Sequence, residues 1–218
     1  MADHTFLFAD LSGFTALTEA HGDEEAADLA AEFCLATRRL LEDNDAEEIK
    51  TIGDAMMIRS DDARRAIHLG LSIVHEVGKQ HGFPVVRVGM HTGPAVERTG
   101  DWFGSTVNVA ARVSGAASGN QVLLSEVTRS EAGEVHGIEL RERGRQTFKN
   151  VSQPLLLFEA VRQGQASTEG LPIDPVCRMA VDPSRRAGVL VHEGVEYSFC
   201  SLDCAGRFAA KPAAYTDA

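Results

Sequence analysis

Two aspartates in this sequence have the residue type and the setting of metal ligands. Asp10 follows the apolar run TFLFA, and Asp54 occupies a Gly-Asp turn between the strand-like flanks of IKTIGDAMMI. If the two segments pair in one sheet, both carboxylates meet at one edge and suit two hard divalent cations, because Mg²⁺ takes oxygen ligands. Taken alone, Asp54 is better explained as ordinary hairpin chemistry, so other residues must decide.

Three cysteines within the last 42 residues form a second candidate site: Cys177, Cys200 and Cys204. Three thiolates suit soft or borderline ions such as Cu⁺ or Zn²⁺ and leave one position open. Asp174, Met179 and His192 are candidates for a fourth ligand, although none lies at a diagnostic spacing. The alternative is a small domain whose reduced cysteines are simply buried.

The composition excludes several classes of function. The chain has 218 residues, is 44% hydrophobic and carries a formal charge of −11. Proteins that grip nucleic acid or an anionic membrane by charge need a basic face, so neither partner is expected. The sequence contains no apolar run long enough to span a bilayer and begins without a signal-like segment, which predicts a cytoplasmic protein.

The elements that must position these residues follow from hydrophobic periodicity. The pattern predicts a strand at 5–11, a long helix from after SGF to about residue 43, a hairpin of strands 46–52 and 55–60, a helix at 61–77 and a strand at 83–93. This is the order of a split βαβ arrangement, with an antiparallel sheet covered by helices on one face. The fold class is therefore α+β, and the two aspartates fall at one sheet edge. Between them, DLSGFT opens a helix whose free N–H groups favour a phosphate.

The segment GDWFGSTVNVAARV makes a family resemblance specific. Together with FLFADLSGFT, IKTIGDAMM and RVGMHTGPAV, it resembles the catalytic domain of class III nucleotide cyclases, in order and spacing, from about residue 5 to residue 161. The resemblance implies a ferredoxin-like or palm-type βαββαβ fold. It also implies a homodimer in which each site combines residues of both subunits.

Roles for individual residues follow from this resemblance. It implies that Asp10 and Asp54, with the Leu11 backbone, hold two Mg²⁺ or Mn²⁺ ions, and that Asn108 and Arg112 orient the ribose and stabilise the transition state. The implied substrate-binding residues are Lys50, Asp101, Gly13, Phe14, Thr15 and Lys149. Lys50 and Asp101 match the types that read adenine, whereas guanylate cyclases resemble Glu with Cys or Ser there, so ATP is the expected substrate.

Some positions depart from the family pattern or have a simpler explanation. The stretch from His91 to Gly104 is short, as in a bacterial subgroup without the long dimerisation arm, and Asn150 replaces a glycine beside Lys149. His91 is expected to be structural, and Cys34 to be a small core residue.

The C-terminal segment resembles a different family. DPVCRMAVDP and VEYSFCSLDCAGRFAAKPAAY look like a YHS domain, with Arg178 where glycine is common. The predicted organisation is a cyclase domain at 1–162, a linker at 163–171 and a YHS-type metal-binding domain at 172–218. The expected activity is conversion of ATP to 3′,5′-cyclic AMP and pyrophosphate, with regulation by the C-terminal domain left open. The alternatives are a guanylate cyclase and a catalytically silent sensor of nucleotide or metal.

Overall fold

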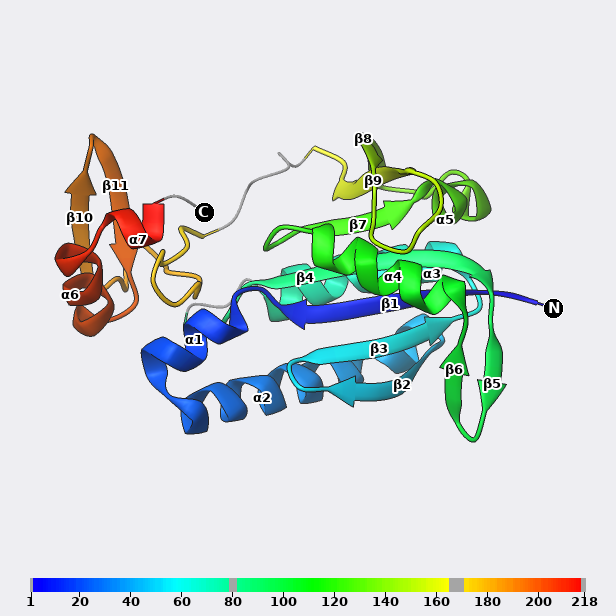
Figure 1. Ribbon diagram of the computed structural model, residues 1–218, viewed down its shortest axis with the longest axis horizontal. Coiled ribbons are helices and arrows are strands. Elements are labelled where there is room, and N and C mark those ends of the chain that lie inside the picture. Colours follow the sequence, from blue (N-terminus) through cyan, green and yellow to red (C-terminus); the bar gives the residue numbers. More distant parts are fainter. Residues whose placement is uncertain (1, 79–81, 165–170, 217–218) are drawn as a thin grey trace.

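A mixed seven-stranded sheet forms the centre of the molecule (Figure 1). The computed structural model describes residues 2–78, 82–164 and 171–216. The strand order is β2-β3-β1-β4-β7-β9-β8. Its strands are β1 (Asp3–Leu11), β2 (Ala46–Ile52), β3 (Ala55–Ser60), β4 (Val86–Pro94), β7 (Val122–Ser125), β8 (Ile138–Gln146) and β9 (Leu155–Arg162). All neighbours pair antiparallel except β4 and β7, which run parallel. The predicted α+β class and the order strand, helix, hairpin, helix, strand are confirmed.

Helices cover both faces of the sheet, so the expectation of helices on one face was wrong. One face packs against α2 (Asp23–Leu41) and α3 (Ala63–Ser72), which continues as a π-helical turn, η2 (Ile73–Val77). The other face packs against α4 (Ser105–Ala116) over the central strands. Gly89 of β4 permits this approach, because a Cβ atom there would lie 1.9 Å from the backbone nitrogen of Ser114.

The long helix predicted after SGF is two helices. α1 (Phe14–His21) ends at Gly22, whose φ of 92° belongs to the left-handed region, and α2 begins at Asp23. A 3₁₀ turn, η1 (Glu42–Asn44), follows α2 and leads into β2. The break turns the end of α1, with His21, away from the axis of α2 (Figure 1).

The remaining elements are short. They are the hairpin strands β5 (Val96–Arg98) and β6 (Asp101–Phe103), α5 (Glu126–Ala132), β10 (Gly188–His192), β11 (Val195–Phe199), α6 (Leu202–Ala210) and α7 (Ala213–Thr216). The β5–β6 hairpin projects from one end of the sheet, and β10, β11, α6 and α7 gather at the other end beside α1 (Figure 1). Most of the predicted linker, residues 165–170, lies outside the described residues, and the predicted domain boundaries stay a prediction.

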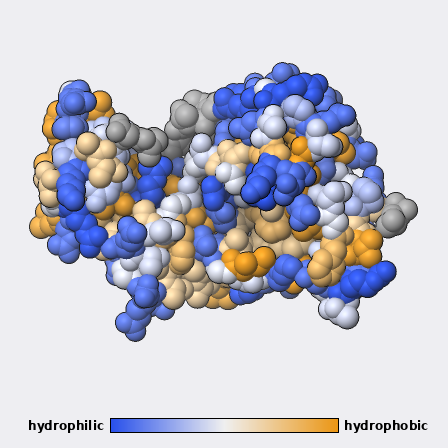
Figure 2. Space-filling view, in the orientation of Figure 1, coloured by the Kyte–Doolittle hydropathy of each residue, from blue (hydrophilic) through white to orange (hydrophobic). Residues whose placement is uncertain are grey.

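The surface is mainly polar on the face seen in Figure 2, with the most hydrophilic side chains over β8. The charged alternation of β8, IELRERGRQ, accounts for this patch. Within the described ranges, no helix has both the length and the apolar character that a bilayer span requires.

Candidate active site

Asp10 and Asp54 meet at the end of the sheet where β1 leads into α1. Strand register places Asp10 opposite Ala55, and Asp54 precedes Ala55 in the turn between β2 and β3. The prediction from the sequence that both carboxylates lie at the same end of neighbouring strands is therefore confirmed. They provide oxygen donors only, and this donor set fits a hard divalent cation.

Arg87 of β4 holds Asp10 from the other side. Its Nε donates to Asp10 Oδ1 at 2.6 Å, and one terminal nitrogen donates to Oδ2 at 3.0 Å. The bidentate pair fixes the orientation of the Asp10 carboxylate, whose remaining lone pairs stay available to a cation. Sequence reasoning missed Arg87, although the antiparallel register of β1 and β4, which sets it opposite Asp10, is a signal that a strand alignment could have found.

Burial raises the pKa of the Asp54 carboxyl, and the negative charge of Asp10 raises it further. A backbone hydrogen bond from Leu11 and the charge of Arg87 act in the opposite direction. Two carboxylates in one partly buried place repel each other, and a bound cation relieves that repulsion.

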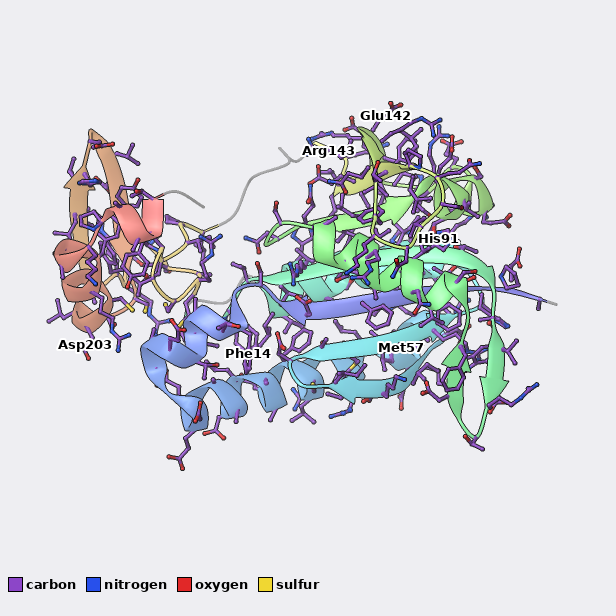
Figure 3. All side chains as sticks on the ribbon, in the orientation of Figure 1. Phe14, Met57, His91, Glu142, Arg143 and Asp203 are labelled. Atoms are coloured by element: carbon purple, nitrogen blue, oxygen red, sulfur yellow. The ribbon has the colours of Figure 1, made fainter. Side chains whose placement is uncertain are left out.

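The turn before α1 leaves the start of the helix without a side-chain cap. Gly13 adopts φ 82° and ψ 27°, which glycine reaches without steric cost, and no side chain caps the helix that begins at Phe14. Phe14 packs between the sheet core and the C-terminal domain (Figure 3), and Thr15 is exposed. Because the first amides of a helix lack intrahelical acceptors, this end of α1 favours an anion.

Lys50 and Asp101 form a second constellation. Lys50 Nζ donates to Asp101 Oδ2 at 2.5 Å, and it lies 6.0 Å from the centre of the Phe103 ring. The hydrogen bond from Lys50 lowers the pKa of Asp101. The two residues implied to read the base are thus brought together between β2 and the β5–β6 hairpin.

Asn108 and Arg112 lie on α4 one turn apart, and both side chains are exposed. Within the described residues, no hydrogen bond or ion pair joins Asn108 or Arg112 to the two aspartates or to the Lys50–Asp101 pair. Lys149 is exposed in the segment between β8 and β9, beside Asn150 at φ 65°. The roles of Asn108, Arg112 and Lys149 at the site stay predictions.

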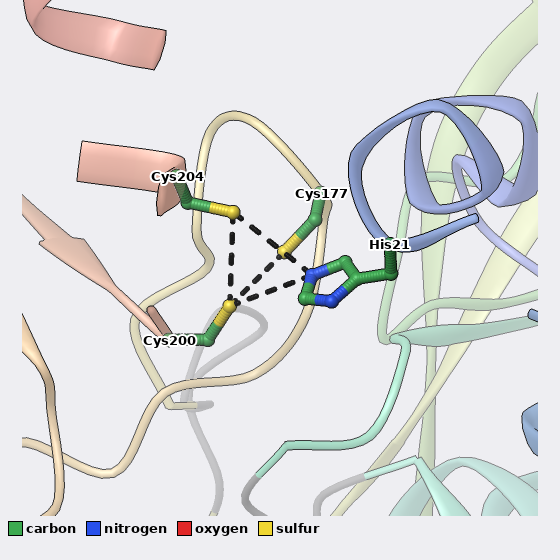
Figure 4. Close-up of side chains that lie close together, drawn as sticks. All are labelled: His21, Cys177, Cys200 and Cys204. Atoms are coloured by element: carbon green, nitrogen blue, oxygen red, sulfur yellow. Dashed lines mark hydrogen bonds between the residues drawn. The ribbon is translucent and has the colours of Figure 1, made fainter. Parts of the chain in front are cut away.

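The three C-terminal cysteines cluster, and the residue that joins them is His21 of α1 (Figure 4). The four ligand atoms all lie within 4.8 Å of one another, so the cluster can hold a metal ion. Sequence reasoning missed His21 because nothing local links α1 to the cysteines.

The cluster of four ligand atoms does not include the fourth ligands considered from the sequence. Asp174 is fully buried, and its carboxylate accepts hydrogen bonds from the backbone nitrogens of Val176 and Cys200, both at 2.8 Å. Met179 is buried in the apolar cluster around the cysteines, and His192 packs its ring edge-on to Phe208. Asp174 therefore braces the two cysteine-bearing segments without joining the ligand set.

His91 and Cys34 occupy structural positions. His91 Nδ1 lies 2.6 Å from the Ser125 hydroxyl, and burial lowers its pKa to about 4. Cys34 is buried on α2 among the core residues.

Residues 1–158 match the family model of the Adenylate and Guanylate cyclase catalytic domain. The chain belongs to this cyclase family. The predicted recognition is confirmed here and at the C-terminal end, where residues 173–218 match the YHS domain.

Relatives with known names agree with this membership. The pH-sensitive adenylate cyclase MT1302 of Mycobacterium tuberculosis is 38% identical over 167 residues, which covers 75% of this chain and 42% of that protein. An adenylate cyclase of Streptomyces griseus is 36% identical over 54% of this chain and 29% of its own length. The chain thus corresponds to less than half the length of either relative.

Solved structures show the same fold. The adenylyl cyclase CyaB of P. aeruginosa superposes with a TM-score of 0.64 and 22% identity, covering 75% of this chain and 97% of that one. The seven-stranded sheet with its flanking helices is therefore the cyclase fold.

Proposed function

We propose that this cyclase-family chain is an adenylate cyclase that converts ATP to 3′,5′-cyclic AMP and pyrophosphate at a homodimer interface. The observation that carries the proposal is the pairing of Lys50 with Asp101 in a chain that also sets Asp54 beside Asp10. Asp10 and Asp54 would hold two Mg²⁺ or Mn²⁺ ions, with the Leu11 backbone as a further ligand. The formal charge of −11 disfavours a nucleic acid or an anionic membrane as partner. We propose ATP as the ligand and a cytoplasmic location.

The separation of the two constellations supports a dimeric site. α1 and the β5–β6 hairpin lie at opposite ends of the sheet (Figure 1), and Lys50 already pairs with the hairpin residue Asp101. We infer that a site needing the metal aspartates, the Lys50–Asp101 pair and the α4 residues together draws them from two chains. A second copy related by a two-fold axis would complete two equivalent sites.

The reaction is an in-line attack of the ribose 3′-oxygen on the α-phosphorus. When bound, the two divalent cations supply positive charge that acidifies the attacking hydroxyl and neutralises the departing phosphates. The start of α1, with Gly13, Phe14 and Thr15, binds phosphate oxygens through its free amides. Lys149, which lies outside this turn, is a further phosphate ligand.

The residues of α4 act on the reacting centre. Residues four apart project from the same side of a helix, so Asn108 and Arg112 can reach the sugar and the α-phosphate together. Arg112 stabilises the charge that grows on the phosphate in the transition state, and Asn108 orients the ribose.

The base-reading pair favours ATP over GTP. An aspartate accepts a hydrogen bond from the adenine amino group, and an ammonium donates to a ring nitrogen. Guanine offers the opposite arrangement at its six-position, so the same pair leaves groups unsatisfied and discriminates against it.

The test is a product assay. Purified protein is incubated with ATP or GTP and Mn²⁺, and the products are separated and identified. We expect cyclic AMP and pyrophosphate from ATP, with at least tenfold less product from GTP. Preferential cyclic GMP would instead make the chain a guanylate cyclase, and binding without turnover would make it a nucleotide sensor.

A further inference from the structure

The last residue of α1, His21, lies beside the three thiols of the C-terminal domain. His21 Nε2 lies 3.8 Å from Cys200 Sγ and 3.9 Å from Cys204 Sγ (Figure 4). Cys200 Sγ in turn lies 3.4 Å from Cys177 Sγ and 3.9 Å from Cys204 Sγ. Four ligand atoms from two separate parts of the sequence thus surround one point.

These separations fit a tetrahedral ion. A tetrahedron with metal–sulfur bonds of about 2.3 Å has sulfur–sulfur edges of about 3.8 Å, and its sulfur–nitrogen edges are slightly shorter. The two sulfur–sulfur separations, 3.4 and 3.9 Å, bracket the expected edge, and the two sulfur–nitrogen separations, 3.8 and 3.9 Å, are slightly longer than theirs. Three thiolates and one imidazole are also a ligand set typical of closed structural zinc sites.

Residues around the cluster hold the ligands in place. His21 Nδ1 lies 3.1 Å from Glu25 Oε1, so the carboxylate fixes the ring with Nε2 toward the thiols. A ligating histidine usually pairs its other nitrogen with such an acceptor. The buried carboxylate of Asp174 braces the Cys200 backbone on the opposite side. The histidine and the Cys200 segment are therefore each held by a carboxylate of their own domain.

The site lies inside a contact between the two parts of the chain. Leu17 and Ala26 of the catalytic domain are fully buried against apolar residues of the C-terminal domain, including Phe199 and Phe208. Backbone hydrogen bonds of 2.9 Å run from Gly82 to Ala180 and from Ala180 to Phe83. Arg207 also donates to the Glu19 carbonyl near the end of α1 at 2.9 Å.

The same contact reaches the phosphate-binding turn. The aliphatic part of Arg178 crosses Gly13, where a Cβ atom would lie 2.5 Å from Arg178 Cγ. Arg178 itself adopts φ 67°, a left-handed conformation that is strained for a residue other than glycine. One end of α1 therefore touches Arg178, and the other carries His21, both facing the C-terminal domain.

We propose that His21, Cys177, Cys200 and Cys204 bind one tetrahedral ion of the Zn²⁺ class, and that this ion fastens the C-terminal domain to α1. The four-coordinate set with an imidazole favours Zn²⁺ over Cu⁺, which is satisfied by fewer, softer ligands. The ion stabilises the docked arrangement, in which Arg178 packs on the turn that opens α1. Occupancy of the site is thereby coupled to the order of the nucleotide-binding end of the helix.

The first experiment measures zinc binding by the full chain without nucleotide. The reduced protein is stripped with a chelator, reloaded anaerobically with Zn²⁺, and assayed for bound metal by elemental analysis and by competition with a chromophoric chelator. We expect one zinc per chain. Replacing a second-sphere carboxylate typically weakens metal affinity about 10- to 100-fold, so Glu25→Ala should fall in that range and His21→Ala should lose at least as much.

Matched variants distinguish ligands from bystanders. His136→Ala removes an exposed histidine elsewhere, and Cys34→Ser alters the one cysteine outside the cluster. Both should bind zinc as the wild type does. If His21→Ala binds zinc with wild-type affinity, or if the wild type takes up none, the four-residue site is overturned.

The second experiment measures hydrogen exchange along α1 with and without zinc. We expect zinc to slow exchange at residues 14–21 in the wild type and in His136→Ala, but not in His21→Ala. Stoichiometric zinc with unchanged exchange in α1 would reject the fastening of the two domains. Neither measurement depends on catalysis, so the inference can fail or stand independently of the cyclase proposal.

Discussion

Lys50 and Asp101 are 51 positions apart in the sequence, yet the Lys50 ammonium donates a 2.5 Å hydrogen bond to the Asp101 carboxylate. The contact is made between β2 and the first residue of β6, so it ties the short β5–β6 hairpin to the edge strand of the central sheet. Both side chains are about one-third exposed, at 38% and 30%. An ion pair so open to solvent adds little to stability, so its value lies in presenting a donor and an acceptor to a ligand.

The first prediction concerns the choice of base. Replacing Lys50 by Glu and Asp101 by Cys in one protein should lower kcat/KM for ATP by more than about tenfold, because adenine then loses both hydrogen-bonding partners. The kcat/KM for GTP should fall less or rise. Steady-state assays with both nucleotides measure the ratio.

A charge reversal elsewhere provides the control. Arg65→Glu disrupts an exposed ion pair between α3 and Asp45 and should leave the ratio unchanged. An equal loss for ATP and GTP in the double variant would mean that Lys50 and Asp101 support the hairpin and do not read the base.

Local patterns predicted the elements that carry the catalytic candidates. The Gly-Asp turn and its flanking strands located Asp54, and the apolar strand before DLSGFT located Asp10 at the same edge. Strand alternation and helix periodicity are properties of neighbouring residues, so they can be read directly from the chain.

Features that depend on packing between distant segments were not predicted. The partnership of Arg87 with Asp10 follows from the register of β1 and β4, and the position of α4 follows from its close contact with Gly89. The break at Gly22 was missed because the helical periodicity continues across it. His21 was missed because its partners come from a different domain, and no local spacing encodes that contact.

The second prediction concerns Arg87. Its positive charge opposes the rise in the Asp54 pKa that burial and Asp10 cause, so Arg87→Gln should raise that pKa further. Asp54 must be ionised to bind a cation, and the acidic limb of the pH–activity profile should therefore move to higher pH. Profiles of kcat/KM at one fixed, subsaturating Mn²⁺ concentration measure the shift.

Arg186→Gln, which breaks an exposed pair with Glu196, is the matched control and should keep the wild-type profile. An acidic limb that stays in place in Arg87→Gln would show that Arg87 does not tune the carboxylate pair.

The third prediction concerns His91 and stability. The folded pKa of about 4 is below the value of about 6.5 expected for an unfolded chain, so the unfolded state binds more protons between these limits. The stabilising effect of keeping His91 neutral is complete above pH 6.5 and is lost as pH falls toward 4. At pH 5 the free energy of unfolding should have dropped by about 2 kcal/mol from this residue.

The measurement compares wild type with His91→Asn by urea unfolding at pH 7.5 and pH 5.0. The variant should be less stable at pH 7.5, because it loses packing and the contact with Ser125, and its deficit should shrink by about 2 kcal/mol at pH 5.0. A deficit that is the same at both pH values would contradict the lowered pKa.

The last prediction tests whether each site is shared between two chains. If the metal aspartates of one subunit work with the α4 residues of the other, Asp10→Asn and Arg112→Ala should each be nearly inactive as homodimers. Mixed one to one with free exchange, about half of the dimers are heterodimers, and each has one doubly altered site and one intact site. Activity should recover to about a quarter of wild type if the sites act independently.

A second mixture supplies the control for this test. Asp10→Asn mixed with Asp54→Asn should recover nothing, because both changes affect the metal side and every site retains one of them. Cyclic nucleotide production by the two mixtures, at matched protein concentration, gives the comparison. Equal recovery in both mixtures would mean that Asp54 is not a metal ligand beside Asp10. Its role would then be limited to the turn between β2 and β3. No recovery in either mixture would place each site within a single chain, against the separation of α1 from the β5–β6 hairpin.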